Sequence, residues 1–178
     1  EDETGEAAKL ETCVSLIASS SAAGHKILLF SHFASMLERI RERLLQEGIS
    51  SHLLVGATPK EERSRMVQAF ASDEVSVFLI SLKAGGTGLN LTAADIVIHY
   101  DPWWNVAAQD QATDRAYRIG QEKPVTVYKL ILKDTIEENL LKLQNAKLAL
   151  AAQVVSEGMV SLGDLSQNEL MELFEQNP

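Results

Sequence analysis

The chain has 178 residues, enough for about one domain, with 46% hydrophobic and 23% charged residues. This composition excludes a wholly disordered chain, and the single cysteine excludes a disulfide scaffold. No apolar run approaches the roughly 18 residues of a membrane span, so we expect no membrane partner. The net charge of −9 argues against a nucleic-acid partner, but residues 1–11 and 157–178 carry all of it and residues 12–156 are neutral.

Short apolar runs alternate along the chain with segments in which apolar residues recur at helical spacing. A strand covered on both faces shows a continuous apolar run, so the runs predict buried strands. The alternation predicts a three-layer α/β domain around a mostly parallel sheet. We expect strands at residues 26–30, 51–55, 75–82, 96–100 and 125–132, and helices at residues 6–18, around 37–44, from 58 past 70, at 105–119 and from 135.

Three segments follow from this pattern. Residues 1–24 form an acidic N-terminal segment with an entry helix, which the run of serines before Gly24 should end. Residues 25–133 form the α/β domain, and residues 134–178 form a helical extension with an acidic tail whose last helix starts near Ser166. Thr58 and Thr135, each followed three residues later by Glu, predict capping boxes at two helix starts.

A glycine-rich loop, residues 83–90 with Gly85, Gly86 and Gly88, follows the third expected strand. Ligands of parallel sheets bind at the carboxyl ends of the strands, and glycines there let backbone N–H groups approach a phosphate. A tight turn into a short helix explains the loop equally well. No G-x-x-x-x-G-K-[ST] sequence occurs, so the chain lacks a Walker A phosphate loop.

The helix expected at residues 105–119 carries Gln111, Arg115 and Arg118 at i, i+4 and i+7, which places them on one face. Two guanidinium groups on adjacent turns can clamp phosphoryl oxygens in the manner of arginine fingers. The alternative is a pair of solvated arginines bonded to the acidic residues Asp110 or Asp114.

Other candidates follow expected strand ends. Trp103 and Trp104 are adjacent, and one of them could pack in the core while the other stacks on a base or enters a groove. The hydroxyls of Ser31, Thr58 and Thr92 could donate to successive phosphates or could simply cap helices. The four histidines and the cysteine lack metal-ligand spacing, so we expect no metal site in this chain.

Five segments in order resemble the second RecA-like lobe of the Snf2 (SWI/SNF-type) ATPases of helicase superfamily 2, a P-loop NTPase-like fold. The resemblance extends from about residue 9 to residue 153. The segments are residues 27–33 (motif IV), 56–63 (motif IVa), 81–95 (motif V), 101–105, and 110–121 (motif VI). The compact spacing between motifs V and VI favours a bacterial or archaeal protein.

The resemblance implies roles for individual residues. Arg115 and Arg118 would reach ATP bound on the first lobe, and Gln111 would report the nucleotide state. Gly88 and Asn90 would lie near the nucleotide. The residues implied to contact the backbone or groove of the tracked DNA are Ser31, Thr58, Lys83, Thr92 and Trp104.

The resemblance further implies an ATP-dependent translocase on double-stranded DNA that uses ATP with Mg²⁺. Motifs I and II, which hold both, belong to a first lobe whose motifs this sequence lacks. We therefore expect the chain alone to hydrolyse no ATP and to bind DNA weakly. Implied partners are the first lobe, DNA, and a DNA-bound protein or RNA polymerase, in the nucleoid of a prokaryote or the nucleus of a eukaryote. The alternatives are a lobe of an RNA or strand-separating helicase, or a protein-docking module.

Overall fold

A computed structural model describes residues 2–72, 75–84, 89–103, 106–114 and 123–157. Five strands form one sheet in the order β2-β3-β1-β4-β5, and every pairing is parallel. The predicted α/β class and all five strands are confirmed. The strands are β1 (Ile27–Ser31), β2 (Ser51–Leu54), β3 (Val77–Ser81), β4 (Ile96–His99) and β5 (Thr126–Lys129).

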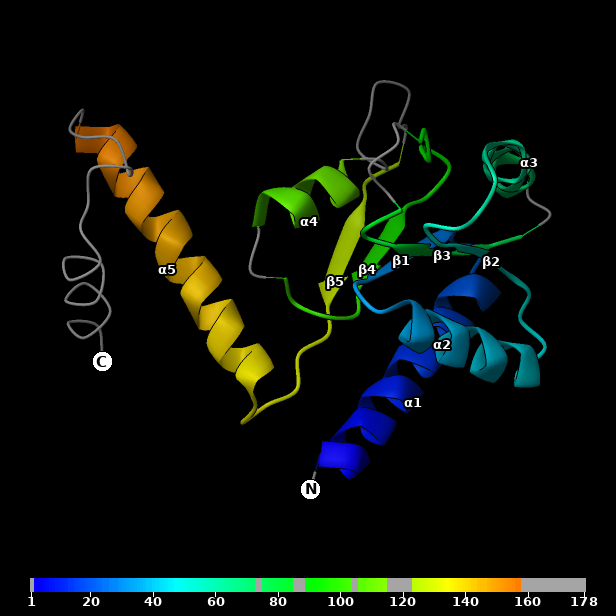
Figure 1. Cartoon of the computed structure of the whole chain (residues 1–178), viewed down its shortest axis with the longest axis horizontal. Helices are drawn as coiled ribbons and strands as arrows, with labels where there is room; N and C mark the ends of the chain where they lie inside the picture. Colours follow the sequence, from blue (N-terminus) through cyan, green and yellow to red (C-terminus); the bar gives the residue numbers. More distant parts are fainter. Residues whose placement is uncertain (1, 73–74, 85–88, 104–105, 115–122, 158–178) are drawn as a thin grey trace.

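Helices cover both faces of the sheet, giving three layers (Figure 1). One face packs against α1 and α2, and the other packs against α3 and α4. The last helix, α5, extends away from the sheet (Figure 1). The helices are α1 (Asp2–Ala22), α2 (Ala34–Gln46), α3 (Lys60–Ala71), α4 (Val106–Thr113) and α5 (Ile136–Glu157).

The alternating side chains of the strands divide the core into two clusters. Ile27 and Leu29 of β1 point to the α1/α2 face, and Leu28 and Phe30 point to the α3/α4 face. All four side chains are essentially inaccessible to solvent. Burial on both faces explains why these strands read as continuous apolar runs in the sequence.

On the α1/α2 side, the buried residues include Cys13 and Ile17 of α1 and Ile40 of α2. Gly48 ends the α2 region with a φ of 74°, as the sequence predicts, because glycine adopts this conformation without strain. On the α3/α4 side, Phe70 of α3 packs against Phe78 with ring centroids 5.6 Å apart.

One predicted helix end and one predicted helix start differ from the structure. Helix α1 continues through the serines to Ala22, because the Ser19 hydroxyl bonds the carbonyl of Leu16 within the same helix. Helix α3 begins at Lys60 with no side-chain cap, because the Thr58 hydroxyl instead accepts the N–H of Val55.

The start of α5 confirms the predicted cap at Thr135, whose hydroxyl accepts the N–H of Glu137 at 3.2 Å. Glu138 accepts the N–H of Asp134 at 2.8 Å rather than that of Thr135, so the reciprocal bond is shifted by one residue. The helix expected near Ser166 lies outside the described residues, and the three-segment division remains a prediction.

A buried ion pair joins α1 to the first turn of α5. Lys9 donates to both carboxylate oxygens of Glu137 at 2.6 Å, and its side chain is only 5% exposed. The Lys9 ammonium also lies 4.8 Å from the centre of the Tyr100 ring. Glu137 also accepts the N–H of Leu132 at 2.8 Å, so its carboxylate connects α1 to the turn that precedes α5.

Strand β5 ends the sheet, pairs with β4, and leaves all four of its residues exposed. Within the described residues, no helix is both long enough and apolar enough to cross a bilayer.

Replacement of Lys9 by Met should lower the free energy of unfolding of the 178-residue chain by about 2 kcal/mol, because it leaves a half-buried carboxylate without its cation. Denaturant unfolding followed by circular dichroism measures this. The matched control is Arg39→Ala, which removes an exposed 3.6 Å pair with Glu6 and should cost no more than about 0.5 kcal/mol. Equal losses in the two variants would contradict the role of the buried pair.

Candidate functional site at the carboxyl edge of the sheet

The parallel strands all end at one edge of the sheet, where the loops that follow them meet. Ser31 ends β1, and its carbonyl accepts the N–H of Leu82, which follows the neighbouring strand β3. Lys83 comes next and is exposed. Beyond β3, the loop after β2 contributes Thr58.

Asp101, just after β4, fastens the loop after β1. Its Oδ2 accepts the Ser31 hydroxyl at 2.6 Å and the His32 N–H at 2.7 Å. The Ser31 hydroxyl in turn accepts the N–H of Phe33 at 3.1 Å. Ser31 is fully buried and gives its one hydroxyl hydrogen to Asp101, so a contact with an external phosphate would require exchange of that partner.

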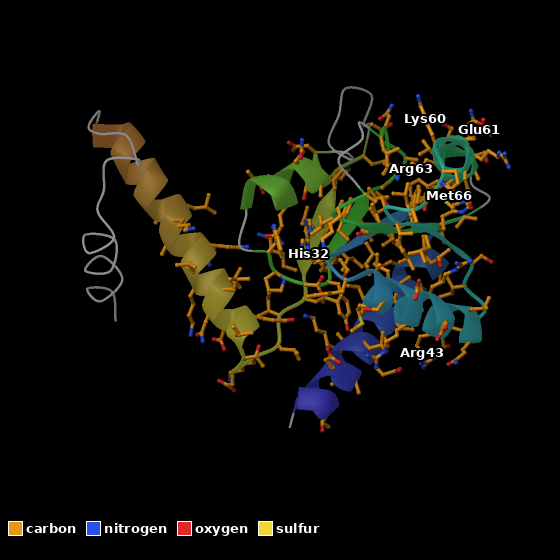
Figure 2. The ribbon with its side chains drawn as sticks, in the orientation of Figure 1. His32, Arg43, Lys60, Glu61, Arg63 and Met66 are labelled. Carbon is orange, nitrogen blue, oxygen red and sulfur yellow. The ribbon has the colours of Figure 1, made fainter. Side chains whose placement is uncertain are left out.

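His32 and Trp103 bring the loops after β1 and β4 face to face. Their ring centroids lie 3.3 Å apart at an interplanar angle of 24°. Burial lowers the pKa of His32, the nearby Lys83 lowers it further, and Asp101 opposes both. The imidazole lies where the two loops meet, as Figure 2 shows. A neutral aromatic pair beside Lys83 therefore forms part of this edge.

Arg63, on the first turns of α3, braces the loops after β2 and β3. Its guanidinium donates to the carbonyl of Thr58 at 2.8 Å and to that of Gly56 at 3.0 Å. It also donates to the carbonyl of Ala84 at 3.4 Å, in the loop that follows β3. Figure 2 shows Arg63 beside Lys60 and Glu61 at the start of α3. The backbone conformation around Thr58 is thus fixed by a charged side chain.

Helix α4 is tied to the sheet through His99, the last residue of β4. His99 Nε2 lies 2.9 Å from the Thr113 hydroxyl, which donates to the carbonyl of Gln109 one turn earlier. His99 also stacks on Phe30 with centroids 5.7 Å apart. Burial, with a smaller effect from Lys129, lowers the pKa of His99 to about 4, so the ring is neutral at physiological pH.

The structure brings Ser31, Thr58 and Lys83 to one edge, after three adjacent strands. Asn90 is exposed, while Thr92 is half-buried in the segment that returns to the start of β4 at the opposite edge. Gln111 is exposed on α4. Four predicted site residues lie outside the described residues: Gly88, Trp104, Arg115 and Arg118.

Several residues that organise this edge had no predicted role. Asp101 lies in a recognised segment after a strand, and its position there is the signal that could have identified it. Arg63 and Thr113 also lie in recognised segments, 56–63 and 110–121, whereas His99 lies in none of them. Their partners, which are backbone carbonyls for Arg63 and the His99 ring for Thr113, have no signal in the sequence. Their roles depend on how the chain folds back.

Two further groups bear on the chemistry. Within the described ranges, no three His, Cys, Asp or Glu side chains are grouped to hold a metal ion. Burial raises the pKa of the Cys13 thiol to about 12, so this cysteine is protonated at neutral pH and unsuited to act as a nucleophile.

Comparison with known families and structures gives a consistent assignment. Residues 8–120 match the helicase conserved C-terminal domain. The chain is also similar to the crystal structure of the C-terminal part of the Fun30 ATPase domain, with a TM-score of 0.72 and 34% sequence identity. The match covers 76% of this chain and 44% of the Fun30 chain. The sheet and its flanking helices therefore correspond to a RecA-like ATPase lobe, as predicted.

Relatives occur in bacteria and eukaryotes. YwqA of Bacillus subtilis, named as a candidate ATP-dependent helicase/translocase, is 43% identical over 96% of this chain and 18% of its own length. The chromatin-remodelling ATPase INO80 of Cryptococcus neoformans is 40% identical over 95% of this chain and 10% of its own length. The first relatives matched are covered over only 16% to 18% of their lengths.

The His99 site predicts a pH dependence of stability. The native pKa of about 4 lies below the ordinary 6.5, so between these values the unfolded chain binds a proton that the native chain does not. Stability should therefore fall as pH drops from about 6.5 to about 4, by about 3 kcal/mol from this group, and level off below.

Denaturant titrations across this pH range measure the effect. His99→Gln keeps a group able to bond Thr113 but cannot titrate, so the variant should lose this part of the pH dependence. Wild-type and variant stability curves that run parallel from pH 7 to 4 would contradict the assignment.

Proposed function

Because the chain belongs to the helicase conserved C-terminal domain family and its relatives are Snf2-family ATP-dependent helicases, we propose that it is the second lobe of an ATP-dependent translocase on double-stranded DNA. The observation that carries the proposal is the family match over residues 8–120, which contains every predicted site residue. The whole activity requires a first lobe that supplies the ATP and Mg²⁺ site.

The DNA side of the proposal rests on the carboxyl edge. Lys83 is exposed there, beside the His32–Trp103 stack, and supplies a positive charge for a phosphate. Thr58 lies along the same edge in a loop that Arg63 holds. The family resemblance also implies DNA contacts for Ser31, Thr92 and Trp104. Ser31 would have to exchange its bond to Asp101 for a phosphate, and Thr92 lies in the segment that leads from this edge to the start of β4. A body with balanced charges and few phosphate contacts should bind DNA weakly without the first lobe.

The nucleotide side rests on α4 and the residues beyond it. Exposed Gln111 would sense the nucleotide, and Arg115 and Arg118 would stabilise charge on the transferred phosphoryl group. Gly88 and Asn90 would approach the same nucleotide. Phosphoryl transfer depends mainly on positioning and charge stabilisation. This lobe would supply the arginines that stabilise charge, and the first lobe would supply the Walker A loop that holds ATP.

Closing and opening of the two lobes during each ATP cycle would alternate their grips on the phosphates and move the protein along the duplex. This work would take place where the DNA lies, in the nucleoid of a prokaryote or in the nucleus of a eukaryote. A DNA-bound protein or RNA polymerase would be the object displaced.

The first test is ATP turnover. The full-length protein with both lobes should hydrolyse ATP faster with duplex DNA than with single strands or RNA, and the 178-residue chain should hydrolyse none, because it lacks a Walker A loop. Phosphate release measures both. Arg118→Ala in the full-length protein should lower DNA-stimulated turnover about a thousandfold while DNA binding persists.

Arg41→Ala is the matched control for that arginine, because Arg41 is exposed on α2, which covers the face of the sheet opposite to α4. Stimulation by RNA alone would replace the proposed substrate with RNA. Full turnover in Arg118→Ala would leave only a docking role for this lobe.

Lys83 tests the DNA-binding edge. In the full-length protein, Lys83→Ala should weaken duplex binding to a similar extent for all sequences, because phosphate contacts do not read bases. The slope of log affinity against log salt should fall by about one, as expected for one lost phosphate contact. The control is Arg41→Ala, which removes an exposed cation on α2. An unchanged salt dependence in Lys83→Ala would show that Lys83 does not contact DNA.

A further inference from the structure

Helix α5 projects from the body (Figure 1). A polar side chain beyond its first turns is nevertheless buried. Gln144 is only 2% exposed, whereas the next residue, Asn145, is exposed and Leu148 is 51% exposed. A neutral amide buried on a largely solvent-facing helix has lost its hydration, and it is stable there only if protein groups replace the water.

The amide nitrogen of Gln144 has two acceptors on two other segments. It donates to the side-chain oxygen of Gln109 on α4 at 3.0 Å, a contact between two buried side chains. It also donates to the backbone carbonyl of Trp103, in the loop after β4. An NH₂ group has two hydrogens, so this one nitrogen can join α5, α4 and the Trp103 loop at a single point.

Helix α4 is therefore held from two sides. Its Thr113 is bonded to His99 at the end of β4, and its Gln109 is bonded to α5. The carbonyl of Gln109 also accepts the Thr113 hydroxyl, so both ties meet at one residue. Gln109 Nε2 is buried and has no hydrogen-bond partner among the described residues, so the position of its amide depends on the bond from Gln144.

We propose that Gln144 is a positioning residue that fixes the nucleotide-facing helix α4 relative to the DNA-facing Trp103 loop. The assignment rests on the proposed function, which places Gln111 of α4 at the nucleotide. The carbonyl of Trp103 belongs to the residue that stacks on His32, next to Lys83 at the DNA edge. A change at either site displaces an acceptor of the same amide, which couples the two sites.

The alternative to coupling is simple packing, and the two differ in what a substitution changes. Loss of a packing contact lowers stability and affects every activity of the folded protein alike. Loss of a coupling contact lowers the response of one site to the ligand of the other. The ratio of DNA-stimulated to basal ATP turnover therefore distinguishes the two roles.

The experiment uses the full-length protein carrying Gln144→Met, Gln109→Met or both. Methionine has a similar length and no amide, so Gln144→Met removes both bonds and Gln109→Met removes one. Asn145→Ala is the control, because Asn145 is exposed on the next position of α5. Basal and duplex-stimulated turnover are measured together with the KM for ATP and the thermal unfolding midpoint.

Gln144→Met should lower the ratio of stimulated to basal turnover about tenfold, with the KM for ATP within about twofold of wild type. Gln109→Met should give a smaller loss, and the double variant should resemble Gln144→Met, because both substitutions break the same link. Asn145→Ala should retain the wild-type ratio.

An unchanged ratio in a folded Gln144→Met protein, or a fall proportional in basal and stimulated turnover, would overturn the coupling role. If Gln144→Met does not fold, the milder Gln109→Met decides by the same ratio. Wild-type protein without DNA stimulation would refute the proposed function itself, whereas normal wild-type stimulation with a normal ratio in the variants would refute only this inference.

Discussion

The arrangement of the whole molecule depends on β1, which is hydrogen-bonded on both sides and buried on both faces. A strand in this position has no water for its backbone and no polar face, so Ile27 through Phe30 must be apolar. The first polar side chain can appear only where the chain leaves the sheet, at Ser31. The same rule applies to the other two inner strands, β3 and β4, which are also buried throughout and end in Ser81 and His99. Because all pairings are parallel, these polar groups collect at one edge. The position of the site is thus a consequence of how the sheet satisfies its backbone.

Much of this could be predicted from the sequence, because continuous apolar runs and parallel topology restrict the fold strongly. The apolar runs expected at residues 26–30, 75–82 and 96–100 identify the central strands, and the residues after them identify the edge. The misassigned features are local choices between equivalent hydrogen bonds. A serine can end a helix or bond its preceding turn, as Ser19 does, and a threonine can cap a helix or close the turn before it, as Thr58 does. Periodicity does not distinguish these alternatives.

The residues that connect distant segments could not be predicted in the same way. Lys9 and Glu137 are 128 positions apart, and Gln144 lies 35 positions from Gln109. In the sequence, each is a polar residue on an amphipathic or charged helix, where solvent exposure is the ordinary expectation. Their burial results from the direction in which α5 leaves β5, which single-residue propensities do not encode. The same geometry gives α5 two anchors, one on α1 and one on α4, and these two contacts fix the direction of the helix relative to the sheet.

The exposed strand β5 has a consequence for the behaviour of this lobe in solution. A terminal strand presents N–H and C=O groups along its outer side, which can template pairing with the strand of another molecule. Its shortness, four residues, limits the number of such bonds, and Lys129 at its end adds a charge that disfavours stacking of copies. Val127 and Tyr128, both exposed, act in the opposite sense. Pairing of separated lobes through β5 would therefore depend on the balance between Lys129 and the exposed apolar pair, which lie outside the acidic ends that carry the net charge.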